Sequence, residues 1–271
     1  MSWMRQRLVH ATASRGYLLF LRRLSASEIS EYPGACDHAA QNGHLVYLRC
    51  AHDNGGTWDR LTPSLAARNG HLACIKYAHE QGCPWGAWTP MRAAANGHLA
   101  CIKYAHEQGC PWDANTCSWA ADGGWLACLQ YAHDNGCPWD ERTSHAASAN
   151  GHLACLRYAH EHDCPWDENT VALAARNGHL KCLEYAHQRG CPWDHLTYVY
   201  AAENGRTDCM QYAYERGCPG ASDATGGRRE AASGAIGRAY LRWKTVRDAD
   251  VRLVLSGRLP ASVATREYVC M

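Results

Sequence analysis

Residues 89–115 read TPMRAAANGHLACIKYAHEQGCPWDAN, and this stretch decides the fold because its pattern recurs every 27 residues. Tryptophans keep the same step from Trp58 to Trp193, and threonines keep it from Thr62 to Thr197. Self-similarity at a short fixed period is the sequence signature of stacked repeat architectures. The chain is therefore predicted to be an array of repeats. A cysteine column has the same spacing and consists of Cys83, Cys110, Cys137, Cys164, Cys191 and Cys218.

Each repeat contains the signals of two short helices. Thr89 is predicted to be the N-cap of the first helix, and Pro90 takes the next position, where a missing N–H costs nothing. The pair Asn96-Gly97 ends this helix, since glycine adopts the left-handed conformation readily. A second helix follows from His98 to the next glycine. Helices of about ten residues are marginal alone, so stacked neighbours must bury their apolar sides.

The repeat register predicts three parts of the chain. Residues 1–34 form a degenerate N-terminal capping repeat, because residues 16–21 precede the related residues 43–48 by 27 positions. Residues 35–220 form seven repeats. After them the register fails, and residues 221–271 are predicted to be a Gly-rich linker and a C-terminal helical cap.

Composition and charge restrict the possible functions. The net charge is +1, yet residues 34–218 carry 13 basic and 19 acidic side chains, so both ends are basic. We see no signal peptide and no apolar stretch of about 20 residues that could span a bilayer. The 16 cysteines are therefore expected to be reduced thiols of an intracellular protein, in the cytoplasm or nucleus. Neither a nucleophile–base–orienter set nor a Gly-rich phosphate loop stands out, which predicts a protein that is no enzyme and has no cofactor.

Several motifs resemble the ankyrin repeat. Asn69-Gly70-His71-Leu72 and Asn177-Gly178-His179-Leu180 are near-verbatim matches, and Thr-Pro and Ala-Ala precede them in the pattern. The resemblance implies an all-α, ankyrin-like α-solenoid of helix–turn–helix repeats. An ankyrin unit has about 33 residues, and the six that are missing here correspond to the β-hairpin finger, which we expect to be reduced or absent. Cys-Pro-Trp-Asp at this spacing is similar to arrays of large DNA viruses that infect amoebae, pandoraviruses in particular, which implies a viral protein that interacts with its host.

Histidines and cysteines in the repeat leave a zinc site open as an alternative. His71, Cys74, His79 and Cys83 have zinc-ligand side chains at plausible spacings. His79 lies about 80° around the helix from His71, however, which is unfavourable for convergence on one ion. Burial of small, soft cysteines explains them without a metal. Disulfides between repeats are not expected, since packed helices lie about 8–10 Å apart and a disulfide needs Cα atoms about 4.4–6.8 Å apart.

The histidine before the second helix recurs as His71, His98, His152 and His179 and is expected to bond to backbone of the neighbouring repeat. Trp125 and Arg206 replace it in two repeats, which we interpret as drift. A second alternative function is nucleic-acid binding through the basic C-terminal helix. Its cations are Arg238, Arg242, Lys244, Arg247 and Arg252.

Positions that vary between repeats predict the binding surface. In a repeat array the constant positions maintain the stack and the variable ones face outward. Trp, Tyr and Arg, which are enriched at binding hot spots, occur at these variable positions. We therefore predict a monomeric, non-catalytic scaffold that binds a partner protein on the concave face of the inner helices, and the viral resemblance implies a host protein as this partner. The competing interpretation is neutral variation. The candidate residues are Arg60, Arg68, Trp88, Met91, Arg92, Asn115, Trp119, Asp122, Arg142, His145, Arg176, Tyr198, Tyr200 and Glu203.

Overall fold

A computed structural model describes residues 34–221, which are helical throughout and contain no strand in that range. The chain divides into two compact units, Met1–Trp166 and Asp167–Met271. The predicted terminal caps and linker lie outside the described residues, apart from Gly34 and Ala221. The described helices of the first unit are α4 (Ala35–Gln41), α5 (Leu45–Asp53), α6 (Leu61–Arg68), α7 (Leu72–Glu80), α8 (Trp88–Ala95), α9 (Leu99–Glu107), α10 (Ala114–Asp122), α11 (Leu126–Asp134), α12 (Glu141–Ala149) and α13 (Leu153–Glu161). Those of the second unit are α14 (Glu168–Asn177), α15 (Leu180–Gln188), α16 (His195–Glu203) and α17 (Thr207–Glu215).

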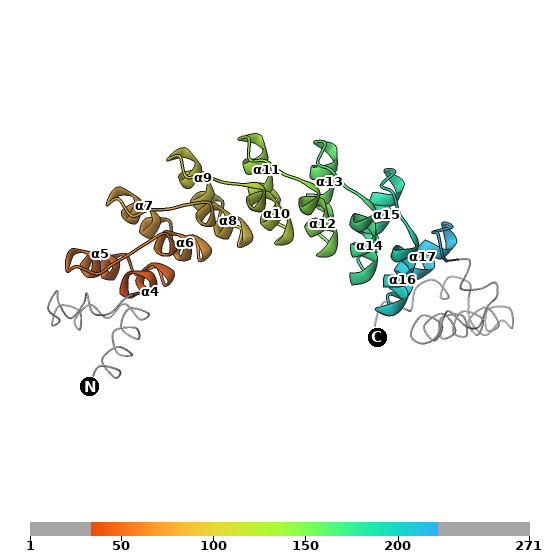
Figure 1. The fold of residues 1–271 in the computed structure, drawn as a ribbon, viewed down its shortest axis with the longest axis horizontal. Coiled ribbons are helices and arrows are strands. Elements are labelled where there is room, and N and C mark those ends of the chain that lie inside the picture. The colour runs from red at the N-terminus through yellow and green to blue at the C-terminus, as the bar shows by residue number, and fades with distance from the viewer. Residues whose placement is uncertain (1–33, 222–271) are drawn as a thin grey trace, which may run out of the picture. The chain divides into compact units, whose positions relative to one another are not determined.

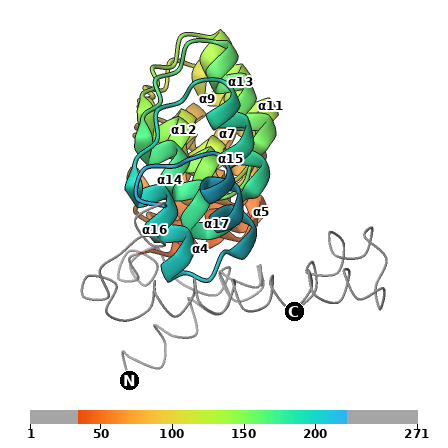
Figure 2. The same cartoon turned by 90° about the vertical axis from the view of Figure 1, so that its right-hand side faces the viewer.

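Consecutive helices form pairs, each joined by a short turn. The even-numbered helix comes first in each pair, and within a unit these first helices form one row beside a second row of odd-numbered helices (Figures 1 and 2). The helix-pair array predicted from the period is thus observed. Between pairs the chain has no strand in residues 34–221, so β-hairpin fingers are absent there.

Aspartate, at the position three residues before the recurring threonine, is the N-cap of four first helices, α10, α12, α14 and α16. Asp113 has an extended backbone with φ −141°, and its carboxylate accepts a hydrogen bond from the Asn115 N–H at 3.0 Å. Equivalent caps precede α12, α14 and α16. The predicted threonine N-cap is therefore wrong: in these helices the N-cap lies three residues earlier, because aspartate satisfies the first free N–H groups of the helix.

The threonines lie inside the first turn and are buried. Thr62 is fully covered, and its hydroxyl donates to the Asp37 carboxylate of the preceding repeat. Pro63 follows within the first four helical residues, whose N–H groups have no intrahelical acceptor, so proline fits there. The hydrogen bond from Thr62 to Asp37 joins α6 to α4. The hydroxyls of Thr89, Thr116, Thr143 and Thr197 are buried without a hydrogen-bond partner among residues 34–221, so those threonines contribute through packing.

Small residues set how closely the first helices approach. Ala66 and Ala67 are fully buried in α6, and Ala93 and Ala94 are in α8. In the first unit, successive first helices contact each other more extensively than successive second helices do. That unit consequently bends toward its first helices (Figure 1). The side of the first helices that faces away from the second helices is therefore the concave side of this unit, and we call it the first-helix face.

A bracket of three aromatic rings joins successive repeats within each unit. His79 stacks on Trp85 with ring centroids 4.0 Å apart, and its Nδ1 lies 3.1 Å from the Tyr104 hydroxyl of the next repeat. Tyr104 also meets the Trp85 ring edge-on at 6.2 Å. The bracket recurs as His52–Trp58–Tyr77, His106–Trp112–Tyr131, His133–Trp139–Tyr158 and, in the second unit, His187–Trp193–Tyr212.

Buried thiols tie the end of one repeat to the turn of the preceding one. The Cys137 Sγ donates to the Asp113 carbonyl at 3.3 Å, and Cys191 donates to the Asp167 carbonyl at 3.2 Å. Every described cysteine is a free thiol. Burial raises the pKa of Cys110 to about 12 and that of Cys74 to about 11, so these thiols stay protonated.

Candidate protein-binding surface

Two tryptophans and one arginine stand out on the first-helix face of the first unit. Trp88, the first residue of α8, keeps 59% of its surface exposed, and Trp119 of α10 keeps 45%. Arg92 lies one turn after Trp88 on α8, with its guanidinium carbon 5.8 Å from the Trp88 ring centroid. Monomeric proteins usually cover such large rings, so their exposure here points to a contact surface.

Arg92 and Trp119 occupy the same register position in neighbouring repeats, because they are 27 residues apart. Since packed helices lie about 8–10 Å apart, we expect about this distance between the backbones of α8 and α10. Arg60 and Arg68 are exposed at the two ends of α6, and Arg92 is half-exposed. We call the set of Arg60, Arg68, Trp88, Arg92 and Trp119 the arginine–tryptophan patch.

Arginines of this patch make no ion pair with an acid of the described chain. The acids near them already accept other hydrogen bonds. Asp59 accepts from the Leu61 N–H at 2.7 Å, and Asp122 accepts from the Asn150 amide at 2.8 Å. Three guanidinium groups thus lie at the surface of α6 and α8 without a carboxylate partner among residues 34–166.

The remaining predicted residues of the first unit lie beside the patch. Arg142 forms a salt bridge of 2.7 Å with Asp140, and it also donates to the Asn115 side chain at 3.1 Å. Hydrogen bonding from Arg142 lowers the pKa of Asp140. Met91 and His145 are half-buried. Arg142 is thereby held by its own neighbours, unlike the patch arginines.

In the second unit, the predicted residues divide between surface and core. The Arg176 guanidinium lies 5.9 Å from the Tyr200 ring centroid, and Glu203 is exposed. Tyr198 is 1% exposed, so its assignment to the binding surface is wrong. It occupies the register position of Pro63 and Pro90, both buried, and this register could have identified it as a core residue.

The residue before each second helix bonds to the preceding repeat, including where histidine is replaced. The His98 Nε2 lies 3.1 Å from the Arg68 carbonyl. Trp125 donates its indole N–H to the Ala95 carbonyl at 3.1 Å, and in the second unit Arg206 donates to the Arg176 carbonyl at 3.2 Å. Trp125 and Arg206, interpreted as drift from histidine, thus keep its hydrogen bond, because His98, Trp125 and Arg206 all place a nitrogen at the same acceptor position.

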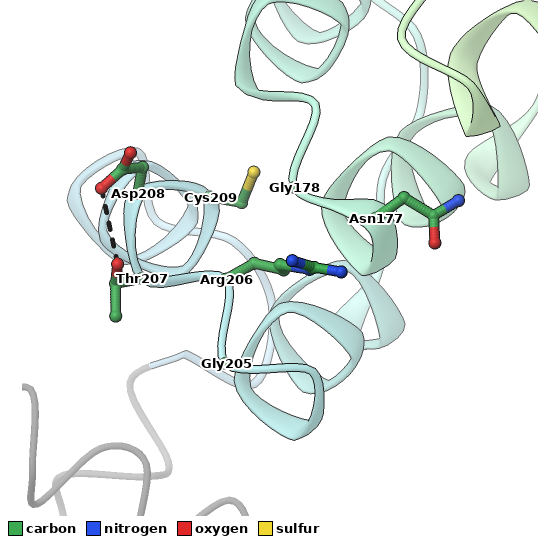
Figure 3. A pocket seen from close by; sticks show the side chains of 7 residues that line it. All are labelled: Asn177, Gly178, Gly205, Arg206, Thr207, Asp208 and Cys209. Atoms are coloured by element: carbon green, nitrogen blue, oxygen red, sulfur yellow. Dashed lines mark hydrogen bonds between the residues drawn. The ribbon is translucent and has the colours of Figure 1, made fainter. Parts of the chain in front are cut away.

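Arg206 also accounts for a shallow hollow in the second unit. Asn177, Gly178 and residues 205–209 line it (Figure 3). The Arg206 side chain lies across from the Asn177–Gly178 turn, and a Cβ added to Gly178 would come within 2.9 Å of its Cδ. We assign this hollow to packing between repeats.

The zinc alternative finds no support in the geometry. His79 uses its Nδ1 toward Tyr104 and its ring face against Trp85. Cys83 donates to the Asp59 carbonyl at 3.3 Å. Across residues 34–221, no three His, Cys, Asp or Glu side chains converge as a metal site would require. The basic C-terminal helix of the nucleic-acid alternative lies outside the described residues.

The described helices are also short. None within residues 34–221 combines the length and apolar character needed to cross a membrane.

Comparison with known proteins identifies the architecture. No family model and no curated protein matches the chain. Among solved structures, the ankyrin repeat domain of human ASB11 superimposes with a TM-score of 0.53 at 16% identity, over 67% of this chain and 96% of that one. The chain has an ankyrin-repeat fold. The repeats here reach that fold with short turns in place of fingers, and with the His–Trp–Tyr bracket at each junction within a unit.

Proposed function

We propose that this protein is a non-catalytic scaffold that binds a partner protein through the first-helix face, with the arginine–tryptophan patch at its centre. Exposure of Trp88 and Trp119 on neighbouring helices is the observation that carries the proposal. Large aromatic and arginine side chains contribute most to the binding energy at protein interfaces. Since the first helices pack against each other through buried alanines and threonines, the exposed parts of Trp88 and Trp119 remain available to a partner.

The partner is proposed to be a protein of a host cell, met in the cytoplasm or nucleus, and the scaffold to act as a monomer. The viral resemblance of the Cys-Pro-Trp-Asp motif supports the host assignment. The ankyrin-repeat fold supports the choice of a protein as the partner class.

Affinity capture tests the proposal. The full chain is immobilised beside a variant carrying Trp88→Ala, Arg92→Ala and Trp119→Ala, and proteins retained from amoebal lysate are identified by mass spectrometry. A control variant with Val46→Ala, Lys76→Ala and Lys103→Ala removes exposed side chains from second helices instead. We expect a partner that the control retains and the patch variant loses, with both variants as helical as the parent. Equal retention by all three proteins would contradict a role for this face.

A further inference from the structure

We propose that the arginine–tryptophan patch binds an extended acidic peptide segment of its partner, with carboxylates on Arg60, Arg68 and Arg92 and an apolar side chain between Trp88 and Trp119. The inference rests on the proposed function and names the chemistry of the partner. Carboxylates beside an apolar group suit this surface because the patch presents cations and aromatic rings together.

Several acids of the first unit accept hydrogen bonds from other groups of the chain. Asp37 accepts the Thr62 hydroxyl, and Asp113 caps α10 through the Asn115 N–H. Asp59 and Asp122 are likewise hydrogen-bonded. The patch arginines have no such partner among the described residues. An approaching carboxylate can therefore take their planar N–H donors without displacing an internal ion pair.

An acid is also missing from the turn at Gly86. The register position of Gly86 holds aspartate in the other repeats from Asp59 onward, as in Asp113 and Asp140. The α8 helix consequently has no side-chain cap. The Arg60 stem reaches this turn, since a Cβ on Gly86 would lie 4.0 Å from the Arg60 Cδ. The repeat that carries Trp88 thus lacks the negative charge that would compete for Arg60.

Cations on the opposite side of the array are arranged differently. Those of the second helices lie over tyrosine rings of the next repeat, with Lys76 5.3 Å from the Tyr104 centroid and Lys103 5.4 Å from the Tyr131 centroid. Glutamate follows each of these lysines by four residues on the same helix, as Glu80 does after Lys76. The lysines of α7 and α9 therefore have an acid on their own helix, whereas α6 and α8 contain no acidic residue.

Binding is measured by fluorescence anisotropy with the full chain and a labelled peptide in which glutamates flank a central leucine. The reference peptide has glutamine for each glutamate. We expect the glutamate peptide to bind at least about tenfold more tightly, a difference of about 1.4 kcal/mol. Added salt should weaken it, because exposed charges are screened. The variant Arg60→Gln, Arg68→Gln and Arg92→Gln should bind both peptides equally. The matched control is Arg49→Gln, Lys76→Gln and Lys103→Gln, which should bind as the parent does.

Gly86→Asp separates binding from folding. It restores the aspartate found in neighbouring repeats, and the position has room for a side chain. We expect the variant to be at least as stable as the parent, because a capping carboxylate is added. Its affinity for the glutamate peptide should fall about tenfold or more toward that of the glutamine peptide, since the introduced carboxylate would pair with Arg60.

A display selection of random peptides on the full chain distinguishes the two possible failures. Enrichment of acidic peptides that need the three arginines supports the inference. Enrichment of neutral peptides that need Trp88 and Trp119 overturns the acidic partner and leaves the proposed function standing. No enriched peptide, together with equal protein capture by the patch variant, overturns both. If single-stranded DNA binds through the same arginines as tightly as the glutamate peptide does, the patch recognises phosphate and the inference is wrong.

Discussion

Replacing Gly97 with alanine tests whether Trp125, the residue before α11, holds adjacent repeats together. Gly97 has φ +76°, and a Cβ added there would lie 2.6 Å from the Trp125 Cε3. The Trp125 indole is rigid, so it must move as a whole. Its hydrogen bond of 3.1 Å to the Ala95 carbonyl would then be lost.

Gly109 provides a matched control within the same unit. It also has φ +76°, yet a Cβ added there meets nothing within 4 Å. Alanine in the left-handed region costs about 1–2 kcal/mol, and this backbone strain is shared by both variants. The lower entropy of the unfolded chain, about 0.4–1 kcal/mol in favour of alanine, is shared as well. The difference between the two variants therefore isolates the contact with Trp125.

We expect Gly109→Ala to lower the free energy of unfolding by about 1 kcal/mol and Gly97→Ala by about 2–4 kcal/mol. The additional loss combines one hydrogen bond, worth about 0.5–1.5 kcal/mol, with displaced ring packing. Urea unfolding followed by far-UV circular dichroism measures both, and the midpoints can be compared when the slopes agree. In a Trp125→Ala background the two glycine variants should become similar. Equal losses in the parent background would refute the proposed role of Trp125.

The remaining predictions concern titration and reactivity. Burial lowers the pKa of His71, His133 and His187 from 6.5, so the unfolded state binds more protons and stability is lost as pH falls through that value. We expect the melting temperature to drop between about pH 7.5 and about pH 5.5, and His133→Gln with His187→Gln to reduce the drop; a melting temperature that rises on acidification would contradict this. A chromogenic disulfide reagent should detect close to all 16 cysteines in denaturant but react slowly with the buried thiols of the folded chain, whose pKa values are raised. Among described residues the half-buried Cys50 should react first, and rapid labelling of Cys110 in the native protein would disagree with its burial.

The sequence predicted the helix pairs well because the residues that end a helix, such as Gly97, and those that favour one, such as alanine, act through the backbone of their own segment. Asn96-Gly97 ends α8, and the second helix starts at Leu99, as the pattern indicated. The threonine cap was wrong because both Asp113 and Thr116 can cap a helix, and only packing decides between them. Thr116 is fully buried and is therefore better placed within the first turn.

The binding surface was harder to predict, since sequence variability does not distinguish an outward position from a tolerant inward one. Tyr198 varies between repeats and is buried, whereas Trp88 varies and is exposed. The sequence did not predict that Trp125 keeps the hydrogen bond of His98, because the two residue types differ and share only a ring nitrogen at the same place. The stacking of His79 on Trp85 was also missed, although the constant spacing of both columns was a signal that could have suggested it.

Within each repeat, the residues that hold the stack together differ from those that face outward, and this explains how such a patch can arise. Junctions within a unit depend on buried alanines, thiols bonded to carbonyls and the His–Trp–Tyr bracket. The register position of Arg92 makes none of these contacts, and it holds leucine at Leu65, tryptophan at Trp119 and alanine at Ala146. At Gly86, by contrast, the residue that varies would be stabilising, because α8 has no side-chain cap where other repeats have a capping aspartate. Since glycine at an N-cap site costs only a few tenths of a kcal/mol relative to a capping side chain, selection on the surface can override this loss without endangering the stack.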